Sequence, residues 1–107
     1  MTTVTPQPGT LNGSNECPVL FVRPSSNVQG LGGAITASIH EHPRITLRAI
    51  GAGAVNQAVK ATIHAGQQLA GEGEVLILRS GNTVVQGNNG TDVTAVVIHC
   101  YLAKGQL

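Results

Sequence analysis

The first apolar residues of the chain follow a strand pattern and then a helix pattern. Residues 20–22 form a short apolar run that Arg23-Pro24 ends, and a buried strand explains this run better than a helix. The next apolar residues are spaced by three or four positions, which predicts a helix that is capped at residues 25–27 and ends before Pro43. Its apolar stripe consists of Val28, Leu31, Ile35, Ile39 and His42.

A second strand and a second helix follow. Residues 45–50 alternate between apolar and polar and then meet Gly51-Ala52-Gly53, which predicts a strand and a tight turn into a helix. This second helix is amphipathic. We expect its inner side to carry Val55, Val59, Thr62, Gly66 and Leu69, with Ala58 and Ala65 beside them and with Asn56, Lys60, His64 and Gln67 on another side.

The remaining apolar runs predict a long hairpin. Residues 75–78, with a continuation through 83–85, and residues 94–102 read as strands, and Gly87-Asn88-Asn89-Gly90 lies between them. Glycines 30, 32 and 33 are costly in the first helix, so either its first turn is irregular or another backbone approaches closely, and we favour close approach.

The order strand, helix, strand, helix, strand, strand predicts an α/β (α+β) two-layer sandwich with both helices on one face of a four-stranded sheet. We assign residues 19–107 to this domain and residues 1–18 to a disordered tail, because the tail has almost nothing to bury. The last strand is apolar on both faces while the helices cover one. We therefore expect a homodimer formed through the sheet and the hairpin.

Composition narrows the function classes. The chain has 107 residues, a hydrophobic fraction of 41% and a formal net charge of +1, so it suits one domain and does not suit strong, nonspecific coating of DNA. No apolar run reaches the length of a membrane span and no secretory pattern opens the chain, which favours a cytoplasmic location. In that compartment Cys17 and Cys100 are expected to be reduced thiols.

The turn before the second helix is a candidate anion site. Gly51-Ala52-Gly53 could expose backbone N–H groups and the positive end of a helix dipole to a phosphate, or the glycines could only permit a sharp turn and close packing. Asn56, Gln57 and Lys60 belong to the first turns of the same helix. Arg48 has an equally good interpretation as a surface residue whose stem lies along the sheet.

Metal and catalytic motifs are weak. His40, Glu41 and His42 invite a metal interpretation, but positions two apart point to different sides of a helix, so an exposed or hydrogen-bonded histidine is favoured and no metal site is predicted. His99 reads as a core or interface residue. No nucleophile stands in a recognisable motif and no acid-base pair can be named, so neither an enzyme nor a cofactor is expected.

The segment from Ala49 to Ala61, AIGAGAVNQAVKA, resembles the signature of the stage V sporulation protein S family, and the similarity extends from about Val19 to Leu102. That family is similar to the Alba superfamily, which implies an Alba-like fold in commonly dimeric proteins that bind DNA or RNA. Several basic positions typical of Alba proteins differ here. Arg23 keeps one charge of a basic pair, Ala52 occupies the turn, and residues 87–92 form a hairpin tip without a basic residue.

Two functions follow as hypotheses. The first is a non-enzymatic regulatory protein that binds RNA or DNA across the starts of both helices. Its predicted nucleic-acid contacts are Arg23, Asn27, Arg48, Gly51, Gly53, Asn56, Gln57 and Lys60. The second is a regulatory protein-interaction module that binds no nucleic acid and assembles through the uncovered sheet face and the neutral hairpin. Near-neutral charge and only two aromatic residues favour the second hypothesis, and the resemblance favours the first.

Overall fold

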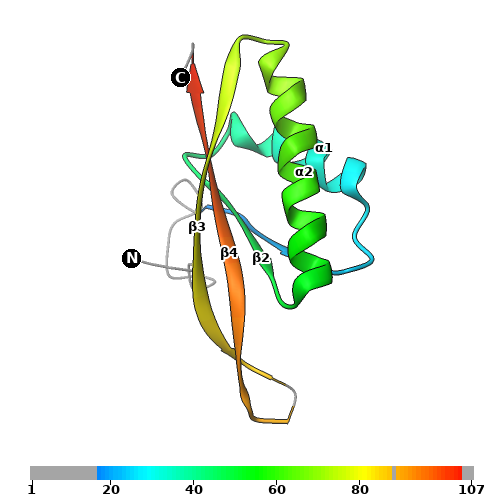
Figure 1. Cartoon of the computed structure of the whole chain (residues 1–107). Coiled ribbons are helices and arrows are strands. Elements are labelled where there is room, and N and C mark those ends of the chain that lie inside the picture. Colours follow the sequence, from blue (N-terminus) through cyan, green and yellow to red (C-terminus); the bar gives the residue numbers. More distant parts are fainter. Residues whose placement is uncertain (1–16, 88, 105–107) are drawn as a thin grey trace.

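Four strands form one mixed sheet in the order β1-β2-β4-β3 (Figure 1). Their bounds are Val19–Val22 for β1, Ile45–Ala49 for β2, Glu74–Gln86 for β3 and Asp92–Lys104 for β4. β1 and β2 are parallel, and the other neighbours are antiparallel. This computed structural model describes residues 17–87 and 89–104, so nearly all of the tail predicted for residues 1–18 lies outside the described residues.

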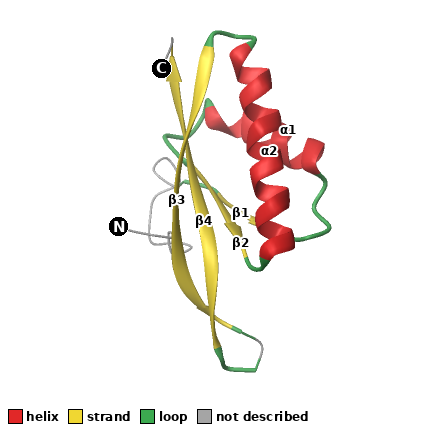
Figure 2. Cartoon of the chain, in the orientation of Figure 1, coloured by secondary structure: helices red, strands yellow, loops and turns green. Residues whose placement is uncertain are grey.

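Two helices, α1 (Val28–Ile39) and α2 (Ala52–Ala70), cover one face of the sheet (Figure 2). The predicted order of elements and the two-layer plan are therefore confirmed. On the covered face, Ile45, Leu47 and Cys100 are fully buried, since β2 and β4 alternate and every second residue points toward the helices. The opposite face of the sheet carries no helix.

Helix α1 is shorter than its apolar stripe predicted. It begins after Asn27, whose side chain caps it, and ends at Ile39 with His40 as the C-cap. The stripe had included His42, but a proline disfavours helical backbone at the residue before it, and Pro43 follows. Close approach, predicted for three glycines, occurs at Gly32, where an added Cβ would lie 2.6 Å from His64 Cδ2.

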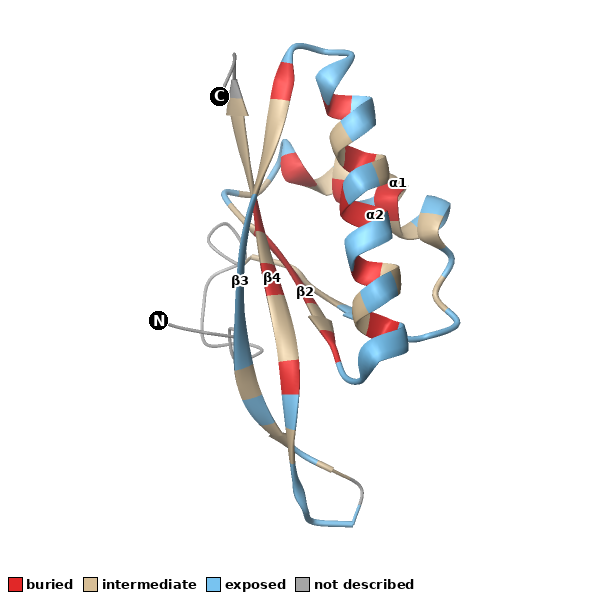
Figure 3. Ribbon diagram, in the orientation of Figure 1, coloured by how far each residue is buried: buried red, intermediate tan, exposed pale blue. Residues whose placement is uncertain are grey.

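Helix α2 buries much of the predicted side, including Thr62 and Leu69, but is rotated away from Val59. The buried residues are small, and Val59, predicted to face inward, is 43% exposed. Alanine is preferred because its short side chain lets the helix axis lie close to both the sheet and α1. Figure 3 shows this buried stripe along α2. It consists of Ala54, Ala58, Ala61, Thr62, Ala65 and Leu69.

The hairpin of β3 and β4 extends beyond the rest of the sheet (Figure 1). The two strands pair from Glu74↔Lys104 to Gln86↔Asp92, whereas β2 reaches only the part of β4 from Val96 to Cys100. The last residues of the hairpin therefore pair only with each other.

Cys100 is fully buried in β4, as expected, and no disulfide joins it to Cys17. Burial raises the pKa of the Cys100 thiol to about 12. Among the helices of the described ranges, none has the length and apolar character needed to cross a membrane.

Candidate nucleic-acid interface

The parallel pairing of β1 with β2 brings the starts of both helices to the same end of the sheet, where β1 and β2 end. We call this end the helix-start edge. Each strand leads directly into a helix, so the turn before α1 and the turn before α2 lie side by side (Figure 1). Pro24 packs against Gly53, where an added Cβ would lie 3.2 Å from Pro24 Cβ. Gln57 Nε2 donates a 2.8 Å hydrogen bond to the backbone oxygen of Ser26. These two contacts join the turns.

The start of α2 is open to an anion. Gly51 is the N-cap residue with φ 90°, and no side chain caps the helix. The first N–H groups of any helix lack intrahelical acceptors and lie at the positive end of its dipole. No acidic residue stands in the first turn of this 19-residue helix to neutralise that end. The backbone geometry that an anion site requires is therefore present.

Both glycines of this turn also have a structural reason. Gly51 adopts a positive φ, which L side chains rarely do, and Gly53 leaves room for Pro24. The sharp turn and the close packing considered from the sequence are thus observed. They are compatible with an anion site, because the same conformation exposes the first-turn amides.

The polar residues predicted for this site divide into two groups. Asn27 Oδ1 accepts a 2.7 Å hydrogen bond from the Gly30 N–H, so Asn27 caps α1, and Gln57 holds the neighbouring turn. Arg23, Asn56 and Lys60 are exposed. Only these last three present exposed side chains to a ligand at the helix-start edge.

Arg48 lies on the other face of the sheet. Its Cζ stands 4.6 Å from the centre of the Phe21 ring, and Phe21 is 61% exposed. Because the registers place Phe21 opposite Arg48 and Arg48 opposite Val97, all three side chains share the uncovered face. Arg48 is therefore beside the helix-start edge but points away from the helices.

The uncovered face is more cationic than the sequence interpretation assumed. Arg79 lies opposite His99 in the sheet, and His99 lies opposite Thr46. Burial, followed by the positive charges of Arg44 and Arg79, lowers the pKa of His99, and Thr46 Oγ1 lies 2.8 Å from His99 Nδ1. No Asp or Glu stands on this face of the four described strands.

The sequence analysis did not predict this cationic group on the uncovered face. It contains three of the chain's four arginines, namely Arg44, Arg48 and Arg79. The signal was available in the strand alternation, because Phe21, Arg48 and Arg79 all fall on positions opposite the buried ones. The alternation does not tell which strands are neighbours. The cross-strand register was needed to show that these residues lie near one another on the same face.

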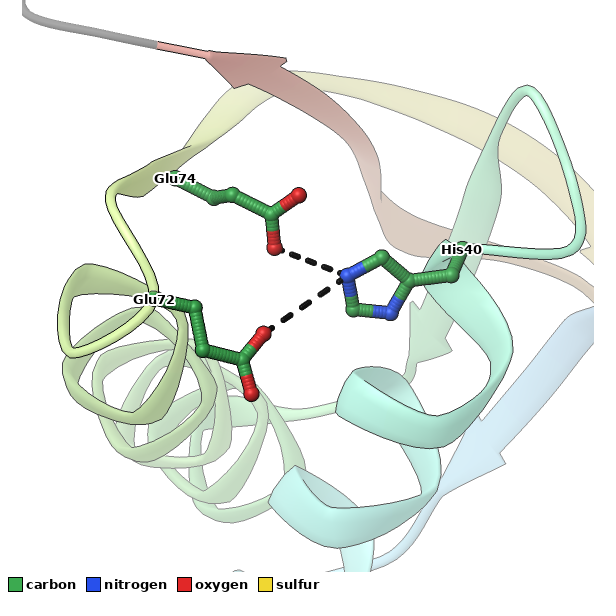
Figure 4. Close-up of side chains that lie close together, drawn as sticks. All are labelled: His40, Glu72 and Glu74. Atoms are coloured by element: carbon green, nitrogen blue, oxygen red, sulfur yellow. Dashed lines mark hydrogen bonds and ion pairs between the residues drawn. The ribbon is translucent and has the colours of Figure 1, made fainter.

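A separate polar cluster lies at the C-terminal ends of the helices and contains His40, Glu72 and Glu74 (Figure 4). A hydrogen bond from Glu74 is the main cause that raises the pKa of His40. The hydrogen-bonded histidine expected at this position is confirmed. The cluster lies away from the start of α2 and takes no part in the helix-start edge.

Comparisons with known proteins place these features in context. The family model described as stage V sporulation protein S (SpoVS) matches residues 18–103. Among solved structures, Alba from Thermoplasma volcanium is similar with a TM-score of 0.55 and 16% identity, over 80% of this chain and 99% of that one. At this identity the likeness shows a shared fold. No curated protein matches the chain by sequence.

Proposed function

The chain belongs to the stage V sporulation protein S family and has an Alba-like fold, and from this premise we propose that it is a non-enzymatic regulatory protein that binds RNA or DNA in the cytoplasm. The observation that carries this proposal is the uncapped N-terminus of α2 at Gly51. Backbone amides there need no basic side chain to hold a phosphate, which suits a chain of net charge +1.

The path of the nucleic acid follows from the exposed groups. Phosphates lie at the start of α2, where Arg23 and Lys60 supply the cations and Asn56 a neutral polar contact. Around the edge, the exposed Phe21 ring beneath Arg48 offers a surface on which an unpaired base stacks. This geometry favours single-stranded or structured RNA, or single-stranded DNA, over a regular duplex.

A homodimer is part of the proposal. Val59 and Ile63 stand one turn apart on α2 and are 43% and 55% exposed, and Leu78, on the helix-covered side of β3, is 47% exposed. An exposed apolar surface of this kind is typical of a protein contact. We place the dimer contact on α2 and the hairpin. The sequence analysis expected a contact through the sheet and the hairpin, and the exposed side of α2 is added to it here. Ile63→Lys should then yield monomers in light scattering.

A protein-interaction module without nucleic acid is the second candidate function. The exposed Phe21 ring on the uncovered face favours it, together with a hairpin tip that carries no basic residue. In that case a different protein, or further copies of this chain, would occupy the sheet face. A measurement of RNA and DNA binding distinguishes the two functions.

The test is a titration of the full chain against RNA and DNA oligomers over a range of salt concentrations. We expect modest affinity and a shallow salt slope, and Lys60→Ala or Arg23→Ala should each flatten the slope by about one. Lys104→Ala is the matched control for loss of one charge and should leave the slope unchanged, because Lys104 pairs with Glu74 at the opposite end of the sheet from the helix starts.

A second variant separates binding from folding. Ala52 is exposed at the first position of α2, so Ala52→Asp should stabilise the helix by about 0.3–1 kcal/mol and repel a phosphate from the same amides. Weaker binding by a more stable protein supports the site. If the wild-type chain at low salt binds neither RNA nor DNA more tightly than about millimolar, nucleic-acid binding is wrong and the interaction module replaces it.

A further inference from the structure

The C-terminal ends of both helices and the start of β3 bring three potential metal ligands together (Figure 4). His40 is the C-cap of α1, Glu72 lies in the turn after α2, and Glu74 is the first residue of β3. His40 Nε2 stands 2.8 Å from Glu74 Oε1 and 3.8 Å from Glu72 Oε1. One ligand atom from each residue lies within 4.8 Å of the others.

Two of these ligands are held in place by the fold. The Glu74 side chain is only 8% exposed, and its carboxylate points toward His40. A hydrogen bond with the backbone of Thr36 also acts on the His40 ring. Histidine ligands of metals are usually oriented by a bond from the second ring nitrogen to a backbone carbonyl.

The charges of the cluster match a divalent cation. Two carboxylates beside a neutral imidazole carry a charge of about −2, which one divalent ion neutralises. Nitrogen and oxygen donors together suit Zn²⁺ and other first-row transition ions better than Mg²⁺ or Ca²⁺, which prefer oxygen alone. Glu72 is 59% exposed, so it is able to swing the short remaining distance toward an ion between the other two.

We propose that His40, Glu72 and Glu74 bind a divalent transition-metal ion, with Zn²⁺ as the representative case, through Nε2 and one oxygen of each carboxylate. Water completes the coordination on the exposed side. The bound ion joins the end of α1 to the turn between α2 and β3 and so stabilises the contact of the helices with the sheet. This site is independent of the proposed nucleic-acid interface.

The test is a calorimetric titration of the full chain with ZnCl₂, in a Cys17→Ser background because a thiol also binds zinc. We expect one ion per chain, thermal stabilisation reversed by a chelator, and no comparable effect of Mg²⁺. Glu72→Gln should weaken binding by about 10- to 100-fold, the size of losses seen at metal sites. Glu41→Gln, which removes an exposed carboxylate outside the cluster, is the matched control and should bind as the parent does.

Co²⁺ gives an independent readout. Bound Co²⁺ should show visible d–d absorption without the strong near-ultraviolet absorption of a thiolate ligand. The visible absorption should be lost in His40→Ala. Because Glu72 is exposed, Glu72→Gln should fold, which unfolding by heat checks. If Zn²⁺ binds equally to the parent and Glu72→Gln, or only at millimolar concentrations, the cluster is an ion pair and the metal site is wrong.

Discussion

The ring of His64 on α2 lies directly against Gly32 on α1, so that a Cβ added at Gly32 would stand 2.6 Å from His64 Cδ2 and 3.1 Å from the Ala61 backbone oxygen. This contact fixes the distance between the helices. Gly32→Ala must therefore displace the His64 ring and press on the Ala61 backbone, and we expect it to lower the free energy of unfolding by about 1–3 kcal/mol despite the better helix propensity of alanine.

Gly33, the next residue of α1, provides the matched control. Nothing lies within 4 Å of a Cβ added there, so Gly33→Ala should raise the free energy of unfolding by about 0.5–1 kcal/mol. Urea unfolding of both variants measures the difference. Equal effects at the two positions would show that helix propensity alone decides and that the close contact has no energetic weight.

Asn27 is expected to act on stability and not on nucleic-acid binding. It accepts a hydrogen bond from Gly30 N–H as the cap of α1, so Asn27→Ala should cost about 0.5–2 kcal/mol, while Asn27→Ser should keep most of the cap. Urea unfolding again gives the measurement. An Asn27→Ser variant that is as stable as wild type but binds RNA or DNA more weakly would show that Asn27 contacts the nucleic acid, as the sequence analysis predicted.

Cys100 should make stability fall in alkaline solution. Its folded pKa of about 12 exceeds the ordinary value of 9.0, because burial favours the neutral thiol. A raised folded pKa contributes stability that is complete below the unfolded pKa and is lost as pH rises toward the folded one. Between about pH 9 and 12 we expect a loss of up to about 1.4 kcal/mol per pH unit.

The Cys100→Ala variant isolates this effect. It lacks the thiol, so its free energy of unfolding should depend less on pH above 9 than that of wild type, although it is less stable at pH 7. Unfolding in urea with reductant at several pH values gives both curves. Parallel curves would mean that another group causes the alkaline loss.

The pKa of His99 should respond to the charge of its cross-strand neighbour Arg79. Burial and then Arg44 and Arg79 lower it, so Arg79→Gln removes one repulsion and should raise the pKa toward 6.5. Arg23→Gln, at the helix-start edge, is the control and should leave it unchanged. An NMR titration of the His99 ring measures both. A pKa that does not move in Arg79→Gln would leave burial as the whole cause.

The sign of the His99 contribution to stability follows from the same shift. The folded state favours the neutral ring, so its contribution is complete above pH 6.5 and is lost as pH falls from that value through the lowered folded pKa. His40 has the opposite shift, and its pairing with Glu74 is complete below 6.5 and is lost as pH rises through its raised pKa.

Local patterns were sufficient for the element order but not for the packing. The alternation of residues 45–50 and the glycines after them predicted β2 and the turn correctly, because strand periodicity and turn chemistry are local properties. The inner side of α2 was predicted only in part, since the pattern gave weight to Val59, which is exposed, and did not place Ala54 and Ala61 inside. The alanines are buried because of how closely α1 and the sheet approach, which depends on residues far along the chain.

The candidate sites show the same division. Gly51 was found from its position between a strand and a helix, whereas Glu74 was not associated with His40, 34 residues earlier. Only the fold places these residues together. The cap of α1 was predicted for residues 25–27, which include Asn27, whereas the contact of Gln57 with Ser26 was missed because its partner lies 31 residues away.

The hairpin that extends beyond β2 divides the molecule into parts that open separately. In the outer hairpin, residues 83–86 of β3 and 92–95 of β4 pair only with each other, while residues 96–100 of β4 lie between β2 and β3. Amide hydrogen exchange should therefore be fast in the outer hairpin and slow in the inner sheet. The outer hairpin can also gain or lose residue pairs with little effect on the core, which leaves its length open to change in evolution.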